Sequence, residues 1–268
     1  MLISVSSVAF PGAKPAELPM LAYAAGADGL AVTCSDKGSL PLDTSDQDAD
    51  AFRKQCEDIG VAISALYGYS GRGVLGDSHA RSRDVDDAKR CIDLAVRLGC
   101  RVVRLFAWKG PSSAPVIDAF VEAVAPISDY AALLGIKIGI PTHHDLAFDP
   151  VSCHRLIAGV GRDRAEVIFN GQSMELDGIP PVQALRSMLD IIGQVELKDW
   201  QRTGSDVTPV PIGSGQATVF PVVRELALNA YGGWLTLHHL SQHHRSLPAL
   251  EPGVSTMVRN YANQFQGR

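Results

Sequence analysis

Two short apolar stretches of this chain end in side chains that can carry protons. The first runs from Gly193 to Asp199 and contains Glu196 and Lys198, with one apolar residue between them. The second runs from Gly233 to Leu240 and contains His238. Side chains two residues apart in a strand share a face, so Glu196 and Lys198 should point the same way. A carboxylate, an amine and an imidazole at neighbouring strand ends could perform acid/base or Schiff-base chemistry beside a carbonyl group.

The strand parity that turns Glu196 and His238 inward also turns other polar groups inward. These groups are Arg104, His143 and Asn170, and Trp108 lies just beyond the strand of Arg104. An unpaired charge among the Val and Leu neighbours of Arg104 would be costly to bury. We therefore expect Arg104 to form an ion pair with Glu196, to face outward, or to recognise a carboxylate or phosphate group.

Structural alternatives exist for the two central charges. Glu196 could serve only as a salt-bridge partner of Lys198 or Arg104. The pair Lys198-Asp199 could be a solvated strand end. If Lys198 is buried instead, its pKa should fall, and the amine becomes a candidate base or Schiff-base former.

Eight apolar segments alternate with helical segments along the chain. The expected strands are 2–6, 28–33, 61–67, 101–106, 137–140, 165–170, 194–197 and 234–238, and the expected helices are 15–25, 43–59, 84–98, 115–134, 150–158, 180–192, 217–230 and 252–265. Such alternation predicts parallel strands joined by right-handed crossovers. At 268 residues, it favours one α/β domain over residues 1–268, a (β/α)₈ TIM barrel. A doubly wound sheet is the rival, but no Gly-x-Gly-x-x-Gly turn follows the first strand.

The composition limits the partners and the compartment. Hydrophobic residues make up 46% of the chain and charged residues 20%, so a sizeable core can form. The net charge of −5 and the lack of a Lys/Arg cluster speak against nucleic-acid binding. Five cysteines without paired spacing favour reduced thiols and a cytoplasmic protein. We expect no signal peptide and no membrane span. The Gly-rich stretch from Gly68 to Gly76 could close a barrel mouth or pack against a second copy in a homo-oligomer.

Four motifs in order resemble one family. They are Gly135 to Ile140 followed by Asp149-Pro150, Val195 to Asp199, Pro211 to Gly215, and Tyr231 to His239. Together they resemble the xylose-isomerase-like TIM barrel superfamily of sugar phosphate isomerases and epimerases. The resemblance covers nearly the whole chain, and it implies a small, sugar-like substrate.

The resemblance also implies one divalent metal, held by Glu, Asp, His and Glu at the ends of strands five to eight. The matching positions of this chain hold Pro141, Asn170, Glu196 and His238. The two family Glu ligands also act as the acid and the base, and Pro141 can neither bind metal nor carry a proton. His143 and Arg202 do match groups that contact substrate in family epimerases.

Two kinds of site remain open. A rebuilt metal site could use His143, Asn170, Glu196 and His238, a donor set that suits Zn, Mn or Fe. Alternatively the site holds no metal. Glu196 and His238 then act as a base and an acid, while Arg104 or Lys198 holds the anion.

Three function hypotheses follow. The first is an isomerase, epimerase or lyase that moves a proton beside the carbonyl group of a sugar or hydroxy-carbonyl compound. The second is a non-catalytic barrel that binds a sugar-like ligand or a partner subunit, because the metal ligand set is missing. The third is an abasic-site DNA endonuclease of the same superfamily. The acidic balance, together with Ala31 and Pro141, counts against the third.

Overall fold

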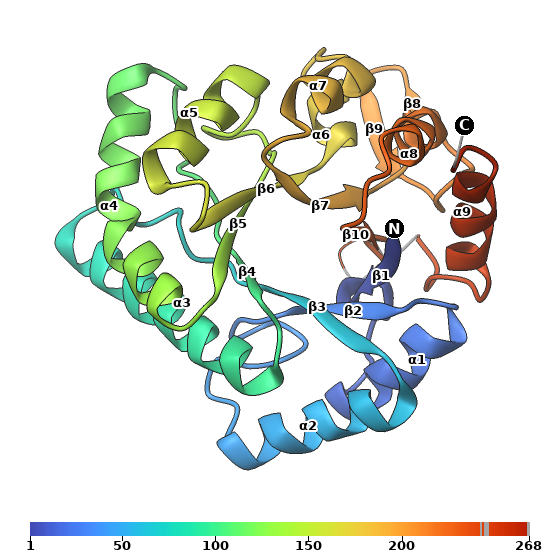
Figure 1. The fold of residues 1–268 in the computed structure, drawn as a ribbon, viewed down its shortest axis with the longest axis horizontal. Helices are drawn as coiled ribbons and strands as arrows, with labels where there is room; N and C mark the ends of the chain where they lie inside the picture. Colours follow the sequence, from blue (N-terminus) through green and yellow to red (C-terminus); the bar gives the residue numbers. More distant parts are fainter. Residues whose placement is uncertain (242, 244–246, 267–268) are drawn as a thin grey trace.

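Eight parallel strands form a closed barrel in the order β1-β10-β7-β6-β5-β4-β3-β2 (Figure 1). The computed structural model describes residues 1–241, 243 and 247–266. The barrel strands are β1 (Leu2–Ser6), β2 (Gly29–Thr33), β3 (Ala62–Tyr67), β4 (Val102–Arg104), β5 (Lys137–Pro141), β6 (Ala165–Phe169), β7 (Ile192–Leu197) and β10 (Trp234–Leu237). The expected single-domain (β/α)₈ barrel is confirmed.

Helices surround the barrel on the outside (Figure 1). They are α1 (Leu18–Ala24), α2 (Asp46–Ile59), α3 (Ser78–Leu98), α4 (Ala114–Leu133), α5 (Pro150–Val160), α6 (Gly171–Leu176), α7 (Pro181–Met188), α8 (Val219–Leu228) and α9 (Val254–Asn263), with short 3₁₀ turns η1 (Ser7–Ala9) and η2 (Pro15–Glu17). Side chains of Ser45, Asp77 and Asp149 accept backbone N–H groups at the starts of α2, α3 and α5. Gly60 and Gly99 end α2 and α3 in the left-handed conformation.

Two elements depart from the expected order. An antiparallel hairpin of β8 (Trp200–Thr203) and β9 (Asp206–Pro209) follows β7. The short helix α6 follows β6 directly, because the Asn170 side chain accepts the backbone N–H of Ser173 and caps it. Helix α3 also begins at Ser78, earlier than the expected 84. These differences lie between the barrel strands and leave the barrel order unchanged.

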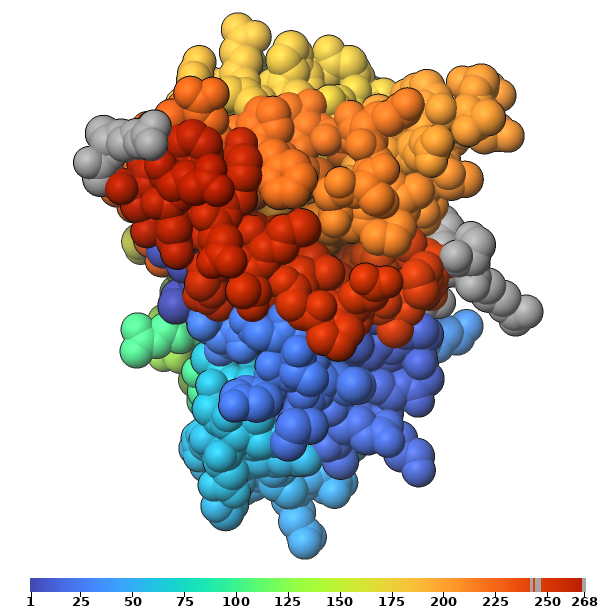
Figure 2. Space-filling model, turned by 90° about the vertical axis from the view of Figure 1, so that its right-hand side faces the viewer, coloured from blue at the N-terminus to red at the C-terminus, as the bar shows by residue number. Residues whose placement is uncertain are grey.

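The ends of the chain close the ring of helices. Helix α9, red in Figure 2, lies against the blue N-terminal part of the chain. The Arg259 guanidinium is 3.0 Å from a carboxylate oxygen of Asp28, which also accepts the backbone N–H of Ile3 at 2.8 Å. This contact fixes the last helix to the first two strands.

The apolar core has two parts. The larger part fills the layer between the barrel and the helices, and the smaller one, inside the barrel, consists of Ala31, Ala65, Tyr67, Val102 and Ile168. Polar side chains continue the interior beside the smaller part, including Glu196, Arg104 and Thr236, all buried. The described helices include none that is both long and apolar enough to cross a membrane.

Candidate functional site

Glu196 is the centre of a buried polar cluster inside the barrel. The residue is only 1% exposed, and both of its carboxylate oxygens lie near polar side chains. Oε1 lies 3.7 Å from Nη1 of Arg104 and 3.7 Å from Nδ1 of His238. Oε2 lies 3.3 Å from Nζ of Lys198 and 3.4 Å from Nδ2 of Asn170, which donates to it. We call these five residues the Glu196 cluster; the parity expected from the sequence brings them together.

The protonation of the Glu196 cluster follows from burial and charge. Burial alone would raise the Glu196 pKa, but His238, Lys198 and Arg104 lower it more, to about 2. Burial lowers the pKa of His238 to about 3, with Glu196 opposing the shift, so the imidazole is neutral near pH 7. Burial also lowers the pKa of Lys198, against the attraction of Glu196. With Lys198 protonated, the cluster carries one net positive charge.

Aromatic rings surround the Arg104 guanidinium. Its central carbon lies 4.4 Å from the Tyr67 ring centre, 5.1 Å from that of Tyr69 and 4.6 Å from that of Phe106. Nε donates to the Gly68 carbonyl oxygen at 3.2 Å. Ring faces attract a guanidinium, so these contacts offset part of the cost of burying it. Arg104 therefore has the ion pair that the sequence offered as one of three possibilities.

The donor set does not suit the rebuilt metal site. A metal cation would be repelled by Lys198 and Arg104, which already neutralise the charge of Glu196. Asn170 turns its NH₂ group to Glu196, while its carbonyl oxygen caps α6. Among the described residues, no group of three His, Cys, Asp or Glu side chains is placed to hold a metal ion. The set of His143, Asn170, Glu196 and His238 therefore does not fit Zn, Mn or Fe in this geometry, and the rebuilt metal site stays an untested prediction.

His143 lies beside the Glu196 cluster and is half-buried. Burial, with the charges of Lys198 and Arg72, lowers its pKa to about 4, so the ring is neutral near pH 7. Its Nδ1 accepts the backbone N–H of His144 at 2.9 Å, which puts the remaining proton on Nε2. The ring meets Phe106 edge-on, with centres 5.6 Å apart. His143 can thus donate a hydrogen bond from Nε2.

The other two expected substrate contacts lie apart from the Glu196 cluster. Trp108 is partly buried and packs against the outer apolar core, and its carbonyl oxygen accepts the N–H of Leu146. Arg202 is exposed on the β8–β9 hairpin, with its guanidinium carbon 5.7 Å from the Trp200 ring. The contacts of the described residues join neither side chain to Glu196. A substrate role for Trp108 or Arg202 stays a prediction.

Asp199 anchors the segment that follows β7. Its carboxylate accepts backbone N–H groups of Trp200 and Gly213 at 2.8 Å, Gly215 at 2.9 Å and Ala217 at 3.2 Å. The residue is 5% exposed, and Lys198 beside it is partly buried. The alternative of a solvated strand end is therefore wrong for Lys198-Asp199. Asp199 instead fixes the strand end that presents Lys198.

Sequence reasoning missed Tyr67 and Tyr69, two of the three rings around Arg104. Tyr67 is fully buried, and burial followed by the Glu196 charge raises its pKa well above the usual value. Its ring lies 5.7 Å from that of His238. The available signal was parity, because Tyr67 is the last residue of β3 and pairs in register with Arg104. Tyr67 therefore belongs to the wall of the site.

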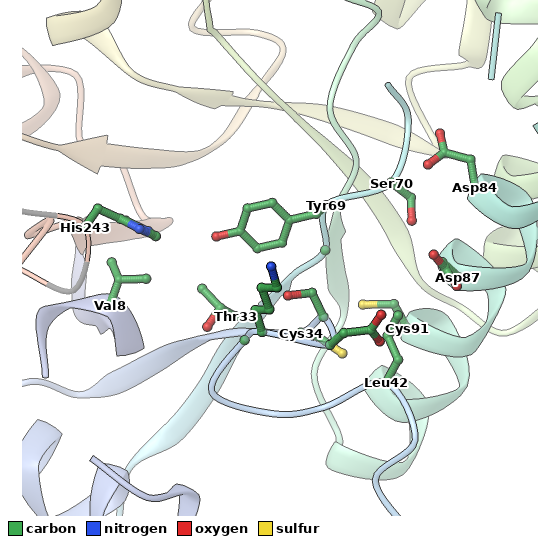
Figure 3. A pocket seen from close by; sticks show the side chains of 15 residues that line it. Val8, Thr33, Cys34, Leu42, Tyr69, Ser70, Asp84, Asp87, Cys91 and His243 are labelled. Carbon is green, nitrogen blue, oxygen red and sulfur yellow. The ribbon is translucent and has the colours of Figure 1, made fainter. Parts of the chain in front are cut away.

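A cavity of about 420 Å³ opens beside the Glu196 cluster, between the ends of β2 and β3 and helix α3. Figure 3 shows Tyr69 and Ser70 on one side of it and Asp87 and Cys91 of α3 on another. Asp36 and Lys37, from the loop after β2, complete the charged lining, with Asp84 of α3. We call this space the β2–β3 cavity. Tyr69 lines it and also contacts Arg104, so the two regions share a wall.

The sequence match decides the family. Residues 20–255 match the family described as xylose isomerase-like TIM barrel. This chain belongs to the xylose isomerase-like TIM barrel family. The resemblance expected from the four motifs is confirmed. A comparison with curated protein sequences found no match to this chain.

Solved structures agree with this family fold. The xylose isomerase domain protein from Planctomyces limnophilus is 19% identical, with a TM-score of 0.74. The alignment covers 98% of this chain and 96% of that one. A D-psicose 3-epimerase, solved in the presence of D-fructose, is 16% identical over the same shares, also with a TM-score of 0.74. A xylose isomerase-like TIM barrel protein from Mycobacterium smegmatis, in complex with magnesium, is 20% identical, with a TM-score of 0.72 and coverage of 98% and 96%. At these identities the likeness shows the shared fold alone.

Proposed function

We propose that this protein is an isomerase- or epimerase-like enzyme that moves a proton beside the carbonyl group of a small sugar or hydroxy-carbonyl compound. The reaction would occur at the carboxyl end of the barrel and would use no catalytic divalent metal. The observation that carries the proposal is the position of Glu196 between Lys198 and Arg104. These cations supply positive charge at the strand ends where the family resemblance implies a metal.

Lys198 is the group best suited to touch substrate. Its side chain is 18% exposed, whereas that of Glu196 is 2% exposed. An ammonium group that is already held in place can stabilise the negative oxygen of an enediolate as it forms. The Nε2–H group of His143 would provide a second donor to the same oxygen. Arg104 and Glu196 would position Lys198 rather than contact substrate.

His238 is the proposed base. Its imidazole is neutral near pH 7, and its Nδ1 faces the Glu196 carboxylate. A proton on Nδ1 would be stabilised by that charge and would leave Nε2 free to accept a proton from the substrate carbon. The imidazolium then returns this proton to the neighbouring carbon or oxygen. Glu196 itself is not assigned this role, because Arg104 and Lys198 already lie against its two carboxylate oxygens.

Hydrogen exchange in D₂O tests the proposal without knowledge of the product. Proton NMR would follow the C–H signals beside the carbonyl group across a panel of aldoses, ketoses and hydroxy-ketones. We expect exchange with at least one compound, and chelator should leave its rate unchanged. His238→Gln should lower the rate about 10²–10⁴-fold, and Lys198→Met about 10²–10³-fold.

Matched variants separate chemistry from general disturbance. His79 and Lys109 are exposed, so His79→Asn and Lys109→Met should leave the exchange rate unchanged. The proposal fails if no compound in the panel exchanges, or if both site variants retain full activity. Loss of exchange on chelation would instead indicate a metal-dependent enzyme.

The second candidate is a non-catalytic barrel that binds a sugar-like ligand. The observation that favours it is burial, because Arg104, Glu196 and His238 are at most 6% exposed. In that case the Glu196 cluster only stabilises the fold. The same panel would show ligand binding without exchange of any C–H signal.

A further inference from the structure

We propose that the β2–β3 cavity binds an amine-bearing, hydroxyl-rich small molecule of the amino-sugar class. The proposal does not depend on the chemistry assigned to Lys198 and His238. Its starting point is the charge of the lining. Asp36, Asp84 and Asp87 line the cavity together with Lys37 and the imidazole of His243. Ionised, the three carboxylates and Lys37 sum to two negative charges, and a protonated His243 would still leave one, which favours a positively charged ligand and opposes a phosphate.

The carboxylates of the cavity differ in whether they have hydrogen-bond or ion-pair partners. Asp84 accepts the backbone N–H groups of Gly71 at 2.7 Å and Gly73 at 2.8 Å. In the described part of the chain, Asp36 and Asp87 have no ion-pair partner. Burial, and then the charges of Asp36 and Asp84, raise the pKa of Asp87. An ammonium group bound near Asp87 would offset this repulsion.

The hydroxyl group of Ser70 also points to a polar ligand. Ser70 is 8% exposed, and Figure 3 shows its side chain directed into the cavity. Its carbonyl oxygen accepts the N–H of Phe106 at 2.9 Å, which holds the residue in place. Within the described residues its Oγ makes no hydrogen bond, so this group is available to a ligand hydroxyl. A hydroxyl of a hydroxyl-rich ligand can therefore take the place of water at Ser70 Oγ.

The loop that carries Asp36 and Lys37 is held by its own hydrogen bonds. Gly38 donates its N–H to Ser35 O at 2.8 Å, and Leu40 donates to Thr33 O at 2.9 Å. The Thr33 hydroxyl accepts the N–H of Ser39 at 2.9 Å. A Cβ on Gly38 would lie 2.7 Å from the Thr33 carbonyl oxygen, so the turn requires glycine. A preformed loop lowers the entropy cost of binding.

The size of the cavity fits a small ligand. Its volume of about 420 Å³ lies in the range of roughly 300–1,000 Å³ that is usual for small-molecule sites. Val8 and Leu42 provide apolar surface between the polar groups. The mixture of carboxylates, hydroxyls and short apolar patches matches a sugar ring, which has polar edges and apolar C–H faces.

A matched set of three probes tests the proposal: D-glucosamine, D-glucose and glucose 6-phosphate. They share a ring and differ in charge. Two-dimensional NMR titrations of the full chain at pH 7 would follow the backbone amides of Gly38, Gly68 and Ser70. We expect the lowest Kd for glucosamine and the highest for the phosphate. Asp87→Asn should reduce the preference for glucosamine over glucose severalfold, and Ser70→Ala should weaken both.

A control variant separates a local contact from the general charge of the protein. Asp86→Asn removes the same charge from the next position on α3, outside the cavity lining, and should retain the full preference. The titration measures binding and needs no turnover, so a failure of the proposed enzyme function would leave this result intact. The proposal is overturned if none of the three probes shifts these amides. It is also overturned if glucose or its phosphate binds as tightly as glucosamine.

Discussion

The Glu196 cluster and the β2–β3 cavity both lie at the carboxyl ends of barrel strands, but they treat charge in opposite ways. In the cluster, Glu196 is 1% exposed and has cations near both oxygens. In the cavity, Asp36 and Asp87 are exposed, and neither has an ion-pair partner within the described residues. Of these two regions, the buried one has cations against its carboxylate, whereas the open one leaves two carboxylates to water or a ligand.

This difference has an energetic basis. A buried charge that loses its partner cannot be rescued by water, whereas an exposed one can. Removing one charge from the Glu196 cluster should therefore damage the fold. Removing one from the β2–β3 cavity should change recognition with little effect on stability.

Glu196→Gln should have the largest effect on stability. The substitution keeps the shape of the side chain but leaves Lys198 and Arg104 without a negative partner. We expect a loss of about 3–5 kcal/mol in the free energy of unfolding, measured by chemical denaturation. The double variant Glu196→Gln/Lys198→Met should recover part of this loss. A loss below about 0.5 kcal/mol for the single variant would mean that the cluster is not a tightly coupled unit.

Asp145→Asn should change the pH dependence of stability. Asp145 is 6% exposed, and burial raises its pKa from 3.8 to about 7. The folded state therefore holds a proton that the unfolded state has released, so this group makes stability fall as pH rises from about 4 to 7. The asparagine cannot ionise and can still accept the N–H of Ala147. We expect a gain on the order of 3 kcal/mol at pH 8 and little change at pH 4.

Glu196 serves as a control for Asp145, because its contribution to stability changes with pH in the opposite direction. Its folded pKa is lowered to about 2, so its contribution is complete above about 4.5 and is lost as pH falls toward 2. Below pH 4, the free energy of unfolding should therefore fall in parallel with pH for the wild type and for Asp145→Asn. Parallel curves between pH 4 and 7 as well would contradict the assignment to Asp145.

Asp87→Asn should have a small effect on stability. The side chain is exposed and has no ion-pair partner in the described part of the chain, so we expect a change within about 0.5 kcal/mol in the free energy of unfolding. A small gain is the expected sign, because the substitution removes repulsion from Asp36 and Asp84. A loss above about 2 kcal/mol would show that the cavity carboxylate supports the fold and does not serve recognition alone.

Added divalent metal should have the smallest effect. Lys198 and Arg104 already neutralise Glu196, so zinc or manganese would gain little by approaching the cluster. Differential scanning calorimetry should give the same Tm with either ion and with chelator. Elemental analysis of protein purified without chelator should find less than one metal per chain. Stoichiometric metal, lost in Glu196→Gln, would restore the metal hypothesis.

The sequence predicted the barrel well because its strands are apolar and end at glycine-rich or polar turns. The β8–β9 hairpin escaped prediction because all but the last of its residues after Trp200 are exposed, so it has no apolar alternation. Helix α6 escaped because it begins Gly-Gln-Ser and depends on the Asn170 cap. The capping signal was present, since Ser173 lies three residues after Asn170.

The candidate site was only partly predictable. Strand parity brought Glu196, Arg104 and His238 together, since it follows from local geometry. Parity could not show that the Lys198 amine would pair with Glu196 where the family resemblance implies a metal. That contact depends on the conformation of a long side chain. The β2–β3 cavity was not predictable, since its lining comes from three segments that meet only in the folded chain.

The four backbone amides gathered by Asp199 have a practical consequence. Because Gly213, Gly215 and Ala217 are tied back to the end of β7, the excursion through residues 201–210 starts and finishes at a fixed point. Its length and composition can therefore change without moving the amine of Lys198. This makes the excursion a suitable place to graft foreign peptides or to diversify a library, with Asp199 left intact.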